Sequence, residues 1–125
     1  MATITDDGIE WKAKREAGVD SVGPANILVL EGTYKAEAAG DTAPSGEITT
    51  GGLARATATA AVVDGTTSQL SNTFTCMVSD TVYGVAIQTT EDLCYVRHAI
   101  AAGRDIEAGD SLSVVAQGVQ SQVTA

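Results

Sequence analysis

Few side chains in this 125-residue sequence are of the types that catalyse reactions or bind metals. His98 is the only histidine, so a site with two histidine ligands is excluded. The two cysteines, Cys76 and Cys94, lie far apart and form no C-x-x-C pair. The motifs G-x-S-x-G, H-E-x-x-H and G-x-x-x-x-G-K-[ST] are also missing. We therefore expect no catalytic residue, no cofactor and no metal, and we predict that the chain is not an enzyme.

The remaining polar clusters have simpler interpretations. Asp105, Glu107 and Asp110 lack the central glycine and distant glutamate of a calcium loop. Their pattern favours a solvated acidic turn, with a weak cation site as the alternative. Cys76 and Cys94 each fall within an expected strand. They are either two small buried thiols or a cross-strand disulfide, which requires Cα atoms within about 7 Å.

The charge balance narrows the range of partners. Sixteen Asp and Glu residues against seven Lys and Arg residues give a net charge of -9. Nucleic acid and anionic membrane both attract cations, so we expect neither as a partner. The start, MATITDD, has no basic and apolar export signal, and no stretch approaches the ~20 apolar residues of a membrane span. The acidic, lysine-poor composition suits high salt, where screening removes self-repulsion, although ordinary solubility also explains it.

The length predicts a single domain over 1–125. Residues 5–18 are expected to form a helix, with Asp7 and Glu10 as a capping box and Gly18 as its end. Its apolar stripe would consist of Ile9, Ala13 and Ala17. Trp11 lies off that stripe, so it is either half exposed or packed against a neighbouring surface.

The rest of the chain reads as β structure. The apolar run 26–33 predicts a first strand, and 34–52 predicts a long loop of the kind that contacts partners. Over 53–120, alternating segments separated by turns predict further strands, with a hairpin at Asp64-Gly65, a core anchor at Phe74 and a bulge or close approach at Gly84. Residues 121–125 form a tail. The expected fold is mainly β: an antiparallel, jelly-roll-like β-sandwich with one short N-terminal helix.

A series of short motifs follows a recognisable order. ITDDGIEWKA (4–13) and GDTAPSGEI (40–48) precede GGLAR (51–55), NTFTCMV (72–78), YGVAIQ (83–88), LCYVRHAI (93–100) and AGDSLSVVAQGV (108–119). In this order the chain resembles a family of small virion proteins of tailed viruses, described as head-decoration or tail-fibre-like proteins. Gln117 stands where that family usually carries an aromatic residue.

The resemblance implies a non-catalytic β-sandwich that assembles as a homotrimer in the host cytoplasm and ends up in the virion. Its function would be to decorate or cement the capsid through contacts with capsid or other virion proteins. A tail-fibre or baseplate component and a host-surface binding module are the alternatives. The composition fits a virus of a halophilic host such as an archaeon. The helix and the long loop are expected to supply the interface, with candidate residues Trp11, Tyr34, Ile48 and Leu53.

Overall fold

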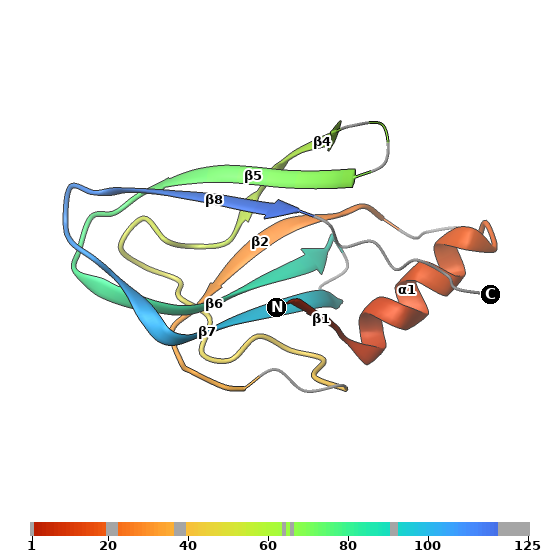
Figure 1. The fold of residues 1–125 in the computed structure, drawn as a ribbon, viewed down its shortest axis with the longest axis horizontal. Coiled ribbons are helices and arrows are strands. Elements are labelled where there is room, and N and C mark those ends of the chain that lie inside the picture. The colour runs from red at the N-terminus through yellow and green to blue at the C-terminus, as the bar shows by residue number, and fades with distance from the viewer. Residues whose placement is uncertain are drawn as a thin grey trace.

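The computed structural model describes residues 2–19, 23–36, 40–63, 65, 67–90 and 93–117. Their strands form two antiparallel sheets that pack like a sandwich, with one short helix at one end (Figure 1). The elements are β1 (Ala2–Ile4), α1 (Asp6–Glu16), β2 (Ala25–Glu31), β3 (Ala56–Thr57), β4 (Thr59–Val63), β5 (Thr67–Thr75), β6 (Asp80–Thr89), β7 (Cys94–Ile106) and β8 (Ser111–Gln117). The predicted mainly β fold is confirmed.

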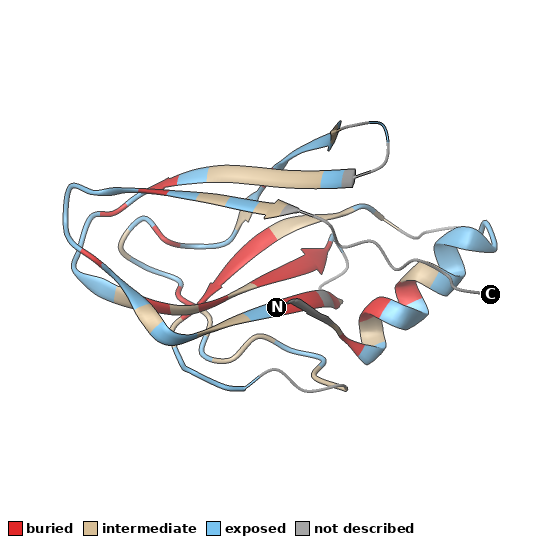
Figure 2. Cartoon of the chain, in the orientation of Figure 1, coloured by how far each residue is buried: buried red, intermediate tan, exposed pale blue. Residues whose placement is uncertain are grey.

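The larger sheet has the strand order β1-β7-β6-β2-β3, and the smaller sheet has the order β4-β5-β8. β2 and β6 lie at the centre of the larger sheet, which explains why both are rich in apolar residues. Figure 2 shows many of the buried residues on β2, β6 and the neighbouring β7, whereas β4, β5 and β8 are largely exposed or half-buried. None of the described helices is long and apolar enough to span a membrane.

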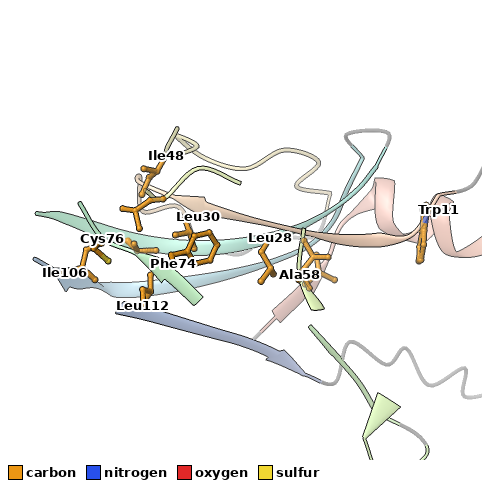
Figure 3. Close-up of a cluster of buried hydrophobic side chains, with 13 residues drawn as sticks. Trp11, Leu28, Leu30, Ile48, Ala58, Phe74, Cys76, Ile106 and Leu112 are labelled. Atoms are coloured by element: carbon orange, nitrogen blue, oxygen red, sulfur yellow. The ribbon is translucent and has the colours of Figure 1, made fainter. Parts of the chain in front are cut away.

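The main core lies between the two sheets (Figure 3). Alternation along β2 directs Leu28 and Leu30 into this core, where they join Phe74 from the smaller sheet. Phe74 is only 3% exposed, which confirms it as a core anchor. Val29 belongs instead to a second small cluster with Ala86 and Cys94. The larger sheet therefore buries apolar residues on both faces.

The helix differs from its prediction in two ways. Its N-cap is Thr5, whose Oγ1 accepts from the Gly8 N–H at 2.9 Å, so the capping box at Asp7 is wrong. The expected apolar stripe is wrong too, because Ile9 is 55% exposed. Within the helix only Gly8 and Trp11 are buried. The Thr5 hydroxyl also donates to the Cys94 carbonyl, which ties the start of the helix to β7.

The strand predictions need two adjustments. The segment after residue 53 divides into β3 and β4, which belong to different sheets, with the buried Ala58 between them. The strand expected at 93–100 continues to Ile106, because its second half pairs with the start of β6. The β4–β5 hairpin is confirmed by the pairing of Val63 with Thr67, although Asp64 and the tail 121–125 lie outside the described residues. A register shift confirms the bulge beside Gly84.

Candidate functional site: an anchored loop

The long loop (34–52) is attached to the larger sheet by a buried cluster of charges. Arg97 on β7 is 1% exposed, and its Nε and Nη2 donate to Glu31 Oε2 on β2 at 3.0 and 2.8 Å. Its Nη1 donates to Oδ2 of Asp41 in the loop at 2.5 Å. Asp41 also pairs with Lys35, with 3.0 Å between Oδ1 and Nζ. One arginine therefore joins two strands and the loop.

Further contacts strengthen this cluster. The Ser45 N–H donates to Glu31 Oε2 at 2.6 Å, so the same carboxylate oxygen binds both arginine and loop backbone. Burial alone lowers the pKa of Arg97, but its bonds and charge interactions with Glu31 and Asp41 outweigh this effect and raise it. Arg97 thus stays charged. Removing one member of such a buried pair typically costs about 3–5 kcal/mol, because an uncompensated charge remains.

The second half of the loop lies against β2. Gly32 N–H donates to the Gly46 carbonyl at 2.7 Å, and Ile48 N–H donates to the Leu30 carbonyl at 2.9 Å. Arg55 binds both carboxylate oxygens of Glu47, at 2.9 and 2.6 Å. This bond lowers the pKa of Glu47. Although the segment contains no helix or strand in its described part, it is fixed at several points.

Gly84 makes room for the charged cluster. A methyl group at this position would lie 2.6 Å from Glu31 Oε1 and 3.2 Å from the His98 carbonyl oxygen. The close approach predicted for Gly84 is therefore confirmed. Glu31 Oε1 is buried and has no hydrogen-bond partner among the described residues. Only glycine fits at this position, because any larger residue would push against this carboxylate.

Trp11 contacts other residues of the same chain and packs within it. Its Nε1 donates to the Gly23 carbonyl at 2.8 Å, and the Arg15 guanidinium lies over its ring, 5.4 Å from the centroid. In Figure 3 its side chain, which extends from the helix, lies apart from the other labelled core residues. It lines a cavity of about 260 Å³ together with Leu70 and Ile87.

Three of the four interface candidates are buried. Leu53 is 0% exposed, Ile48 8% and Trp11 9%, and all three belong to the main core. These side chains offer almost no surface to a partner, because the loop folds Ile48 back onto the sheet, and Leu53 after the loop and Trp11 on the helix also pack into the core. Tyr34 is 47% exposed and is the candidate that lies on the surface.

The end of the sandwich opposite the helix carries an exposed apolar pair. Met77 is 70% exposed and Val78 is 45% exposed. Their segment is hydrogen-bonded to two other loops: Met77 N–H donates to the Gly51 carbonyl at 2.9 Å, and Gly109 N–H donates to the Cys76 carbonyl at 2.8 Å. A tight turn places Met77 beside Gly52. This end is a second surface that the sequence did not single out.

The remaining reactive groups do not come together. Cys76 lies in the main core and Cys94 in the second cluster, and both are free thiols, so the alternative of a disulfide is wrong. Burial raises the pKa of Cys94 to about 12. Asp105, Glu107 and Asp110 are exposed, and no group of His, Cys, Asp or Glu within the described ranges is arranged to hold a metal ion.

Sequence reasoning missed the charged cluster, although part of its signal was present. Arg97 and Glu31 both lie in apolar strand segments, and charges on buried strands need partners of opposite sign. Asp41 gave no such signal, because it lies in a polar loop 56 residues before Arg97.

Comparison with known proteins adds no relative: the chain matches no family model, no curated protein and no solved structure.

Proposed function

We propose that this chain is a structural virion protein that decorates or cements the capsid of a tailed virus through protein–protein contacts. Two observations support this function. The first is the order of the sequence motifs, which resembles that of small virion proteins. The second, which carries the structural side of the proposal, is the attachment of the long loop by Arg97. This contact turns a segment without regular structure into a defined surface.

A fixed loop is well suited to binding. Association orders flexible segments at an entropic cost, and a segment that is already ordered avoids most of it. Tyr34 provides an aromatic side chain on this loop, and aromatic residues are enriched in interface cores. We assign the capsid contact to the loop surface around Tyr34 and Lys35, where Asp41 holds the lysine in an ion pair.

The copy number in virus particles tests this function. Purified particles from the source of the sequence should contain hundreds of copies by quantitative mass spectrometry, and electron microscopy should place them on the capsid. A handful of copies at the tail would assign the chain to the tail fibre or baseplate. Absence from the particles, with binding to host cells instead, would favour the host-surface module and refute the virion function.

A pair of variants tests the loop surface. Tyr34→Ala should reduce the occupancy of capsids by added protein, because it removes the exposed ring. Val62→Ala is the matched control, since Val62 is 69% exposed on the smaller sheet, away from the loop. Equal occupancy for both variants and the unchanged chain would refute the assignment of this surface.

Other copies of the chain are a second proposed partner, and the resemblance implies a homotrimer. The net charge of -9 supports a role in a high-salt host, because salt screens repulsion among the carboxylates. Unfolding in about 0.15 M and about 1 M salt tests this part. Higher stability in the concentrated salt is expected, and equal stability would remove the halophilic assignment.

A further inference from the structure

The smaller sheet differs from the rest of the molecule in charge. The sequence contains sixteen acidic and seven basic residues, yet none of them lies on β4, β5 or β8. These three strands consist of Ser, Thr, Asn, Gln, Ala, Val, Leu and Phe only. Because two copies with a net charge of -9 repel one another, this uncharged sheet is where they approach at the lowest electrostatic cost.

β8 is an open edge of this sheet. It pairs with β5 on one side and with no described residue on the other. Cys76 N–H donates to the Asp110 carbonyl at 2.8 Å just before β8 begins. This bond shows that the hydrogen-bonding groups of Asp110 face the neighbouring chain of β5. Because these groups alternate sides along an antiparallel strand, those of Leu112 and Val114 also face β5, and the N–H groups of Ser113 and Val115 point to the open side.

The other edge strands are shorter, and the part of β7 that extends beyond β1 carries the charged residues Arg104 and Asp105. β1 has three residues, β3 has two and β4 has five, whereas β8 has seven. Beyond β3, the edge of β2 is covered by the bridge between Glu31 and Glu47. Natural edge strands are usually protected by charges, proline, bulges or short length, and the β8 strand has none of these.

A groove follows the open side of β8. It has a volume of about 200 Å³, and its lining includes Val82, Val85, Ile100 and the charged Arg104 from the larger sheet and Val114 and Val115 from β8. Val114 and Val115 point to opposite faces of the strand, so the groove runs around its edge. Val115 is 55% exposed. A strand added here would gain backbone hydrogen bonds and apolar contacts together, as in other cases of strand addition.

We propose that β8 pairs with β8 of a second copy of this chain, antiparallel across a twofold axis. The two smaller sheets then form one continuous six-stranded sheet without a charged residue. Twofold contacts are the commonest between identical chains, and antiparallel pairing is slightly more stable than parallel pairing. This inference does not depend on the virion function, because it concerns only how copies meet, and it proposes a twofold pair in place of the homotrimer that the resemblance implies.

The test measures the mass of the purified full chain by sedimentation over a range of concentrations in low and high salt. A reversible two-chain species that strengthens with salt is expected. Ser113→Glu places a carboxylate of each copy in the contact and should weaken association at least about tenfold. Thr73→Glu is the matched control: Thr73 pairs with Ser113 and is also exposed, but it lies on the central strand β5. It should leave the association unchanged.

Three results would overturn this contact. The first is a single-chain mass at every concentration and salt. The second is a three-chain mass, because a homotrimer would need β8 to pair with a different edge such as β4. The third is a two-chain species that responds equally to both glutamate variants, which would indicate packing of sheet faces. Amide exchange gives an independent readout: Ser113 and Val115 should become protected as concentration rises. A Ser113→Glu monomer that still occupies capsids would separate this contact from the virion function.

Discussion

Replacing Arg97 by methionine tests the anchoring of the long loop most directly. The change keeps a long side chain but leaves Glu31, which is 0% exposed, without its cation. Loss of one partner from a buried ion pair costs about 3–5 kcal/mol. A domain of this size is stable by roughly 6–19 kcal/mol, so the loss is a large part of the total. The expected decrease in Tm is roughly 10–20 °C.

Urea unfolding followed by fluorescence of Trp11 provides the measurement, since it is the only tryptophan and is buried. Arg55→Met is the matched control. Arg55 also contacts both oxygens of a carboxylate, but its side chain is 35% exposed, so its loss should cost no more than about 1 kcal/mol. Equal costs for the two variants would refute the view that the Arg97 cluster is buried and anchors the loop.

A double variant shows whether Arg97→Met is destabilising because Glu31 loses its cation or because the arginine side chain no longer fills its space. Arg97→Met combined with Glu31→Leu removes both buried charges of the pair, and apolar replacement of a buried pair is often neutral. The double variant should therefore be more stable than Arg97→Met alone, while Asp41 keeps Lys35 as its partner. Limited proteolysis should cut both variants faster than the unchanged chain within 34–52, because neither retains the bond to Asp41.

Three further predictions concern single positions. Gly52→Ala should lower the unfolding free energy by at least about 2 kcal/mol more than Gly18→Ala. Both glycines have positive φ, but of the two only Gly52 would place a methyl group against backbone, namely the Thr75 carbonyl oxygen. Equal unfolding free energies for the two variants would contradict this. Glu47→Gln should lose up to about 1 kcal/mol at neutral pH. Because the pKa of Glu47 is lowered from 4.5, the difference in unfolding free energy between Glu47→Gln and the unchanged chain should shrink as the pH falls below 4.5. A difference that stays constant with pH would contradict the assigned bond. Since its pKa is raised from 9.0 to about 12, Cys94 should resist iodoacetamide in the native state at pH 8 and react in urea, whereas native labelling would contradict its burial. By the same shift, stability should fall as pH rises from about 9 to about 12.

Local patterns in the sequence predicted the local features of the fold. Alternation located most strands, the Asp-Gly pair located the hairpin, and Gly84 marked a close approach. Each of these features depends on neighbours along the chain or on backbone geometry, which a single stretch of sequence records. The apolar run of β2 was recognised for the same reason, because strands buried on both faces lack alternation.

The anchored loop could not be predicted in this way, since its contacts join distant segments. Whether Ile48 and Leu53 face a partner or the core depends on the path of the loop, and that path is fixed by Arg97, far along the chain. The helix stripe failed for a related reason. The helix is attached to the rest of the chain through Thr5 and Trp11, so Ile9 stays exposed. Helical periodicity alone does not show which residues of a helix make that attachment.

The pairing of β1 and β2 also constrains the order of folding. Ala2 pairs with His98 and Ala25 pairs with Thr89, so β1 and most of β2 have their strand partners beyond residue 80, although β2 also pairs with the two-residue strand β3. During synthesis these segments cannot complete their sheet until β6 and β7 have emerged from the ribosome. Such non-local pairing slows folding, because loop closure precedes the contacts that reward it. The apolar strand β2 is therefore exposed for most of the chain's synthesis, and that interval is when the protein is most vulnerable to aggregation.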